Sequence, residues 1–408
     1  MMVPAYGDSG RTGRFAVSGL DRPSGWDWHS DIGNPVVGRL LRDGDLLFLG
    51  GGNGVLTAVD ADNGVIRWQK QVRVIRPLPD DWEDPNPDEW DYGWEEHEWL
   101  AIPLAVVAGK VFVKVEIVDQ DPYEVAVDRY TGELVGEVTT GEPGVDPATL
   151  VMLDTLRAVD PLTLRVHWWP KGVDTWPLEA PPAVVDGLVV ASCKVDPERG
   201  HGGLHAFDRA SGERVWGIGV ERDAEGNAVA VHPVHPAVAD RTVWIPRWRG
   251  ESTEIVGFDL RTGRLVHEYA PAEGGRWRAS GAVAVAGGLV YAVLTNGAPL
   301  PEGQSHPAEV HALDAATGEL LWVSPVGLPV VGSPVLAGDQ VLLAGSDGRV
   351  CGLDARTGAL WWTADVEVEL GVGAINAARG VHTEFPAALL PGDGVLYGQS
   401  RTGVVALR

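Results

Sequence analysis

The fold is decided by a short stretch near the end of the chain, "VHALDAATGELLW", which covers residues 310–322. Its first four residues favour a β-strand, and Asp314 opens a turn by accepting hydrogen bonds from backbone amides two or three residues further on. Gly318 tolerates a positive φ, and a second apolar run follows it and ends at Trp322. The stretch therefore predicts a β-hairpin.

The same hairpin pattern recurs along the chain. Five further copies keep an aspartate with a glycine four residues after it: Asp60 and Gly64, Asp128 and Gly132, Asp208 and Gly212, Asp259 and Gly263, and Asp354 and Gly358. A weaker copy around Asp160 keeps the strand and Trp168 but lacks the glycine, and an N-terminal copy has Asp21 and Gly25 at the same offset. Eight copies of one unit indicate a repeat architecture.

The two ends of the chain complement each other. The C-terminal segment "GVLYGQSRTGVVALR" ends in strands at the point where the next aspartate would come, and the N-terminal segment "GLDRPSGWDW" supplies that piece. We expect the N-terminal segment to provide the outer strand of the last blade. Such a pairing closes a ring and removes exposed sheet edges.

The repeat resembles that of the quinoprotein-like β-propellers, whose pyrroloquinoline-quinone-type unit reads roughly strand, "ALDxxTGxxxW", strand. The resemblance covers nearly the whole chain of 408 residues. It implies an all-β, eight-bladed β-propeller of four-stranded blades, forming a single domain over residues 1–408. Members of this family include quinone-dependent alcohol dehydrogenases, an outer-membrane assembly lipoprotein that acts as a scaffold, and sensor domains. The resemblance therefore predicts the fold and leaves the function open.

Tryptophans and cysteines are assigned structural roles. Five indoles stand at or next to the eighth residue after the repeated aspartate: Trp68, Trp168, Trp216, Trp322 and Trp362. We expect them to pack between neighbouring blades, because a large flat ring suits a contact between sheets. Cys193 and Cys351 both follow strand-like runs and define no disulfide framework, so we expect them to be buried as small apolar residues.

Charge and hydropathy exclude some partners. The formal net charge of −25 repels nucleic acid and anionic membranes. The N-terminus shows no signal-peptide pattern, and no apolar run reaches the length of a membrane span. These features predict a cytoplasmic protein.

An insertion interrupts the regular spacing of the repeat. Asp128 follows Asp60 by 68 residues, whereas 48 residues separate Asp160 from Asp208. The excess forms an acidic, tryptophan-rich loop over residues 76–101, and its candidate ligand-binding residues are Trp90, Trp94, His97 and Trp99. One interpretation is a solvated acidic loop whose indoles pack on the propeller rim. The other is a surface that recognises a cationic or sugar-like ligand, or a basic partner segment.

The same loop contains an incomplete calcium-binding pattern. Asp84, Asn86, Asp88 and Glu95 occupy positions 1, 3, 5 and 12 of an EF-hand-like loop. Glu89 replaces the glycine that position 6 requires, and prolines occupy positions 2 and 4. Calcium is the only metal that the sequence suggests.

A second long loop covers residues 364–384 and ends with His382 and Glu384. Comparable positions around the ring hold further polar and aromatic residues: His232, His235, Arg247, Trp248, Arg276 and Trp277. If these loops share one face, imidazole, carboxylate and guanidinium groups converge over a central funnel and supply acid, base and oxyanion-stabilising groups. The alternative is ordinary polarity of the rim.

Catalytic signatures are missing from the sequence. The adjacent cysteines and haem motif of the quinone-dependent dehydrogenases are absent, so pyrroloquinoline quinone is not expected, and neither is any other organic cofactor. No serine-hydrolase elbow, zinc-protease motif or phosphate-binding loop is present.

Two functions are consistent with this sequence. The favoured one is a non-catalytic scaffold or sensor that binds a small ligand or a protein segment on its loop-rich face, and the acidic surface is compatible with a cationic partner. The alternative is a cofactor-independent isomerase, lyase or cyclase, in which His382, Glu384, His232 and His235 act as acid and base. The oligomeric state is left open.

Overall fold

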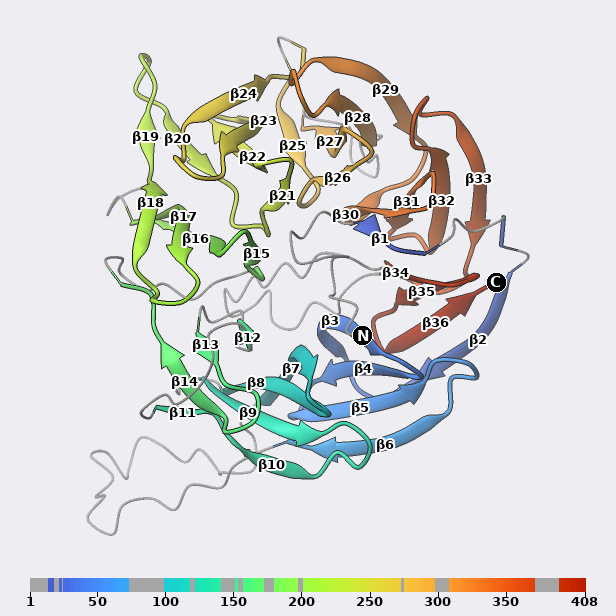
Figure 1. Cartoon of the computed structure of the whole chain (residues 1–408). Helices are drawn as coiled ribbons and strands as arrows, with labels where there is room; N and C mark the ends of the chain where they lie inside the picture. Colours follow the sequence, from blue (N-terminus) through green and yellow to red (C-terminus); the bar gives the residue numbers. More distant parts are fainter. Residues whose placement is uncertain are drawn as a thin grey trace, which may run out of the picture.

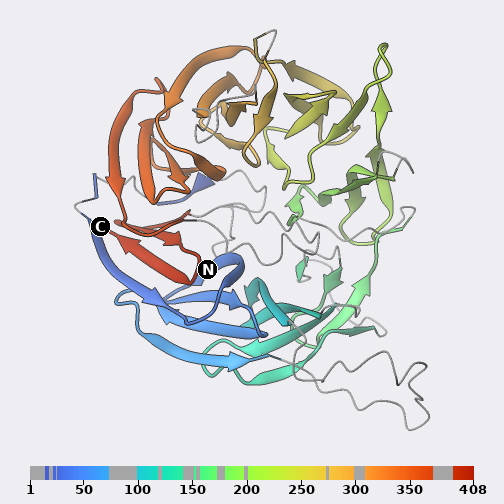
Figure 2. The ribbon, with the colours of Figure 1, turned by 180° about the vertical axis from the view of Figure 1, so that it is seen from behind.

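The computed structural model describes residues 14–17, 22–23, 25–72, 99–117, 122–140, 151–152, 157–171, 180–196, 201–272, 275–297, 308–370 and 389–408. All of the regular elements in these ranges are β-strands, and they form sheets arranged around a central axis (Figure 1). Seen from behind, the same ring of sheets is evident (Figure 2). The protein is an all-β β-propeller.

Three blades keep the plain four-stranded arrangement of consecutive antiparallel strands. The first contains β3 (Val36–Asp43), β4 (Leu46–Gly51), β5 (Val55–Asp60) and β6 (Ile66–Gln71). The second contains β7 (Trp99–Val107), β8 (Lys110–Ile117), β9 (Tyr123–Asp128) and β10 (Leu134–Glu137). The third contains β15 (Ala183–Val185), β16 (Leu188–Asp196), β17 (His201–Asp208) and β18 (Arg214–Ile218).

Two blades carry extra strands because their inner strand is divided. One contains β19 (Glu221–Arg222), β20 (Ala228–Val231), β21 (Ala237–Ala239), β22 (Thr242–Arg249), β23 (Ser252–Asp259) and β24 (Leu265–Tyr269). The next contains β25 (Trp277–Ala279), β26 (Ala284–Ala286), β27 (Leu289–Asn296), β28 (Ala308–Asp314) and β29 (Leu320–Val326). In each, the two short segments pair with the same long strand, β22 or β27.

The last two blades involve the N-terminal segment. One contains β30 (Val330–Ala337), β31 (Gln340–Gly345), β32 (Arg349–Asp354) and β33 (Leu360–Asp365), and β1 (Arg14–Phe15) runs parallel to β30. The other contains β34 (Leu389–Gly392), β35 (Val395–Gln399), β36 (Gly403–Leu407) and β2 (Trp26–Asp31). Strand β2 is antiparallel to β36, so segments from both ends of the chain share one sheet.

An eighth sheet departs from the predicted regular blade. It contains β11 (Thr139–Thr140), β12 (Val151–Met152), β13 (Ala158–Val159) and β14 (Arg165–Trp168), so its strands are two to four residues long. The expectation of eight full blades is therefore wrong, since the described residues form seven full blades and this reduced sheet. The sheet belongs to the repeat copy that lacks the glycine, and Leu164 takes its place with a φ of 59°. This left-handed conformation costs a residue with a side chain about 1–2 kcal/mol.

The hairpin turn has the predicted hydrogen bonds. The Asp314 carboxylate accepts bonds from the backbone amides of Ala316 (2.8 Å) and Thr317 (2.9 Å). The amide of Gly318 donates to the Asp314 carbonyl at 2.8 Å, with φ at 76°. The aspartate and the glycine thus fix the turn together.

The tryptophans pack between blades, as predicted. The Trp216 indole donates to the Leu260 carbonyl of the next blade at 2.8 Å and covers Gly263, where a Cβ atom would lie 2.8 Å from the ring. The same contact joins Trp28 to Gly64, Trp68 to Gly132, Trp168 to Gly212 and Trp322 to Gly358. Trp362 is also buried in an interblade cluster. The glycine is needed both for its positive φ and for the space above it.

Both cysteines are buried and free, as expected from the sequence. Burial raises the pKa of Cys193 to about 11 and that of Cys351 to about 12. In the part of the chain that the structure describes, no helix is long and apolar enough to cross a membrane.

Candidate functional site

The candidate site lies on the blade β19–β24, near the turn between β22 and β23. These two strands pair without interruption from Thr242 opposite Asp259 to Arg249 opposite Ser252. Side chains alternate between the two faces of a strand, so this register divides the polar residues of the hairpin into two groups. One group faces the blade β15–β18, and the other faces the blade β25–β29.

The first group is a network of two arginines and two glutamates. The guanidinium of Arg247 donates to Glu254 at 3.0 and 2.5 Å and to Glu268 at 2.5 Å. Arg249 donates to the second oxygen of Glu254 at 2.5 Å, and this bond raises the pKa of Arg249. Arg247 and Glu254 are buried, which makes their pairing necessary because an unpaired charge there is costly. The four charges cancel.

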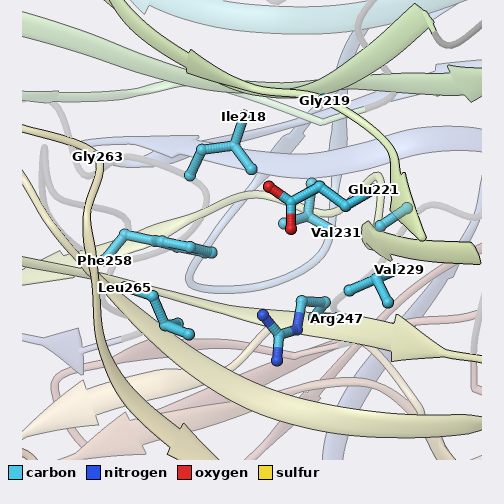
Figure 3. Close-up of a pocket in the computed structure, with 10 residues that line it drawn as sticks. Ile218, Gly219, Glu221, Val229, Val231, Arg247, Phe258, Gly263 and Leu265 are labelled. Carbon is cyan, nitrogen blue, oxygen red and sulfur yellow. The ribbon is translucent and has the colours of Figure 1, made fainter. Parts of the chain in front are cut away.

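A cavity of about 140 Å³ adjoins this network, between the end of β18 and the strands of the blade β19–β24. Apolar side chains line part of it, including Ile218, Val229, Phe258 and Leu265. Two charged side chains, Glu221 and Arg247, also line it. Figure 3 shows the Glu221 carboxylate directed into the space beside Ile218, with Arg247 on the other side of the cavity.

The second group surrounds His232 on the opposite face of the hairpin. The His232 Nε2 lies 3.1 Å from the Thr253 hydroxyl, and its ring centroid lies 4.1 Å from that of Trp248. Burial lowers the pKa of His232 to about 3, so the imidazole is neutral at physiological pH. His235 is also buried.

A third cluster lies between the blades β19–β24 and β25–β29. The Tyr269 hydroxyl is 2.8 Å from His311 Nδ1, and His311 Nε2 is 3.1 Å from Glu309. The Trp277 ring packs edge-on against His311, with 5.5 Å between the centroids. Burial raises the pKa of Tyr269 to about 12 and lowers that of His311, so both groups are neutral near pH 7.

The structure brings some of the predicted site residues together. His232, Arg247 and Trp248 belong to one blade, and Arg276 reaches back to it from the next connection through an ion pair with Glu251 at 3.0 Å. Trp277 turns inward to His311 instead of lining the cavity. These residues therefore lie on the two opposite faces of one blade, and Arg247 alone among them lines the cavity.

The other predicted residues do not join this cluster within the described structure. Trp99 begins β7 in a different blade, where its carbonyl accepts a bond from Gly54 at 2.8 Å. Most of the two long loops lies outside the described residues, including Trp90, Trp94, His97, Asp84, Asn86, Asp88, Glu95, His382 and Glu384. Among the residues that are described, no group of three or more His, Cys, Asp or Glu residues is arranged to hold a metal ion.

Several residues of the site were missed in the sequence. They are Glu221, Glu254, Glu268, Tyr269, Glu309 and His311. A signal for the ion network is visible in "RWRGESTE", because two arginines two residues apart precede a glutamate across a short turn. An antiparallel hairpin places such residues on one face. The contacts that cross between blades leave no comparable local pattern.

Comparisons with known proteins agree with this architecture. A family model described as "Outer membrane protein assembly factor BamB" matches residues 121–303 and 276–408. The fold and the repeat define a β-propeller of the pyrroloquinoline-quinone repeat class. The matched segments span more than half of the sequence, and the chain belongs to the BamB family.

Similar solved structures share the fold at low sequence identity. The computationally designed Ika8 protein has a TM-score of 0.58 and 14% identity, over 95% of this chain and 99% of that one. BamB from Moraxella catarrhalis has a TM-score of 0.45 and 17% identity, over 96% and 92%. The quinohemoprotein alcohol dehydrogenase from Comamonas testosteroni has a TM-score of 0.44 and 14% identity, over 100% and 80%. No curated protein was found to match the chain.

Proposed function

We propose that the protein is a non-catalytic binding or scaffold propeller that holds a segment of a partner protein at the cavity between β18 and the blade β19–β24. The observation that carries this proposal is the cavity itself, which combines apolar walls with charged groups at one interblade contact. Recognition pockets commonly have this composition.

The size of the cavity favours a partner side chain over a whole metabolite. Pockets for small-molecule ligands commonly measure about 300–1,000 Å³. The cavity here is about 140 Å³, which suits one anchoring side chain. A binding energy concentrated in one or a few anchors is typical of protein interfaces.

The chemistry of nearby groups also favours binding over catalysis. A general acid or base works best when its pKa lies near the operating pH. The pKa of His232 is about 3 and its imidazole bonds to Thr253, while Arg247 is held by two glutamates. These groups are suited to fixing a surface in place.

The arrangement of blades supports a rigid scaffold. We infer that β2 closes the ring and that the reduced sheet β11–β14 lies between the blades β7–β10 and β15–β18. The pairing of β2 with β36 supports this inference, as does the Trp168 contact with Gly212 on the far side of the reduced sheet. A closed ring presents its surface without large internal rearrangement.

A library of random displayed peptides tests the binding function. The variant Leu265→Trp fills the mouth of the cavity, since Leu265 lines it and is 44% exposed. Leu320→Trp is the matched control, because Leu320 stands at the same repeat position in the next blade and is 43% exposed. We expect peptides selected on the native protein to bind the Leu320→Trp variant and to lose binding to Leu265→Trp. Selected peptides that bind all three proteins equally, or no selected peptides at all, would contradict the proposal.

A further inference from the structure

The charged groups in and beside the cavity differ in whether they have an ion-pair partner. Arg247, Arg249, Glu254 and Glu268 are paired with one another. Glu221 lines the same cavity, and the described part of the structure gives its carboxylate no ion pair or hydrogen bond. The cavity therefore has one carboxylate available for a ligand.

This free carboxylate sets the sign of charge that the cavity prefers. The two arginines and two glutamates of the network cancel, so Glu221 is the uncompensated charge among the described residues of the network and the cavity lining. The protein as a whole carries −25, which draws cations toward its surface over longer distances. An incoming anion would meet an arginine whose guanidinium is already bound to two carboxylates.

The walls of the cavity require more than a cation. Ile218, Phe258 and Leu265 present apolar surface next to the Glu221 carboxylate. A lysine side chain matches this combination, because its methylene stem packs on apolar surface while its ammonium group reaches a polar or charged partner. A cavity of about 140 Å³ has room for one side chain, and lysine is the one that combines an apolar stem with a positive charge.

We propose that this cavity receives a lysine side chain from a basic segment of a partner protein, with the ammonium group paired to Glu221 and the stem packed on Ile218, Phe258 and Leu265. This inference rests on the proposed binding function and names the chemistry of the partner. It also predicts weaker binding at high salt, because the ion pair at the mouth of the cavity is screened.

The test uses displayed peptide libraries in which one central position is fixed as lysine, arginine, glutamine or glutamate and the other positions are random. Binding is measured to the native protein and to Glu221→Gln. Glu225→Gln is the control, since Glu225 is an exposed glutamate of the same hairpin that does not line the cavity. All variants are first checked for an unchanged melting temperature.

We expect the lysine library to bind the native protein and Glu225→Gln at least threefold better than the glutamine library, and to lose this preference on Glu221→Gln. A preference for glutamate or for arginine overturns the inference, and so does a lysine preference that survives Glu221→Gln. In those cases peptides still depend on the cavity, and the binding function stands. If no library yields peptides whose binding is weakened by Leu265→Trp, the binding function itself is contradicted.

Discussion

Two contacts between neighbouring blades use the same two positions of the repeat. In one contact the first blade supplies the large side chain, and in the other the second blade supplies it. Between the blades β15–β18 and β19–β24, Trp216 packs on Gly263 of the following blade. Between the blade β7–β10 and the reduced sheet β11–β14, the position of the tryptophan holds Gly136 and the position of the glycine holds Leu164. A Cβ atom on Gly136 would lie 3.0 Å from Leu164 Cδ1. The large and small residues have exchanged sides.

This exchange fills the space between the blades but weakens the turn. Trp216 buries an indole and donates a hydrogen bond to the Leu260 carbonyl. Leu164 buries a smaller side chain and holds it at a φ of 59°, which favours glycine. Leu164 lies in the turn between β13 and β14, and the strands of this sheet are only two to four residues long. We infer that the exchanged pair supports full-length strands less well than a bulky ring packed on glycine.

A third contact replaces the tryptophan with polar chemistry. At the contact between β19–β24 and β25–β29, His267 lies over Gly318 and stacks on Trp244 with 5.2 Å between the ring centroids. The Tyr269 and His311 pair lies at the same contact. The blade with the candidate cavity therefore has a tryptophan–glycine contact on one side and a contact made by titratable side chains on the other.

The largest expected effect comes from breaking the regular contact. Trp216→Ala removes a buried indole and leaves the Leu260 carbonyl without its donor, so we expect the free energy of unfolding to fall by about 3–5 kcal/mol. Chemical denaturation measures this loss. Trp361→Ala is the control, because Trp361 is 45% exposed on an outer strand. Similar losses in the two variants would show that a tryptophan between blades contributes no more to stability than an exposed one.

Acid should lower the stability of the blade β19–β24 through its buried histidine, His232. The folded pKa of His232 is about 3, below the value of about 6.5 in an unfolded chain, so its contribution to stability is complete above pH 6.5. This contribution is lost as the pH falls toward 3, at up to about 1.4 kcal/mol per pH unit. Denaturation of the native protein and of His232→Gln between pH 7 and pH 4 measures the difference. We expect a flatter pH dependence for His232→Gln, and identical curves would contradict the assignment.

A double-mutant cycle tests the exchanged contact. Gly136→Trp alone should destabilise the protein, because the indole meets Leu164, and Leu164→Gly alone should leave a void in a buried cluster. Together they restore the tryptophan and glycine of the regular contact. We expect the double variant to lose at least about 1 kcal/mol less than the sum of the single losses. Strictly additive losses would mean that the two positions do not form a pair.

The sequence predicted the parts of this molecule that repeat. Each copy of the aspartate and glycine pattern marks a turn, and the positions of Trp68 and Trp216 predicted contacts between blades. The reduced sheet was not anticipated, although the missing glycine near Asp160 was visible, because strand length depends on what the neighbouring blade supplies. The exchange of Gly136 and Leu164 becomes apparent only when adjacent copies are compared in space.

The candidate site was harder to predict than the fold. Arg247 was identified as a ligand-binding residue, and it does line a cavity. Its partners Glu254 and Glu268 lie on different strands, and Glu221 approaches from a short hairpin beyond β18. The pairing of Arg247 with Glu254 follows a local hairpin pattern, whereas the approach of Glu268 and Glu221 depends on how β24 and β19 pair within the blade.

The smallest expected effect concerns local opening, reported by the two buried cysteines. Cys193 packs in the cluster shared by the reduced sheet and the blade β15–β18, and Cys351 packs in a regular interblade cluster. Burial holds the pKa values at about 11 and 12, so neither thiol reacts readily unless its surroundings open. We expect Cys193 in the Cys351→Ala variant to be labelled about tenfold faster than Cys351 in the Cys193→Ala variant, with mass spectrometry following each reaction. Such a ratio corresponds to a difference of about 1.4 kcal/mol in opening free energy. Equal rates would mean that the contact next to the reduced sheet is as firm as the regular ones, and that the exchange of bulk at Leu164 has no energetic consequence beyond its own turn.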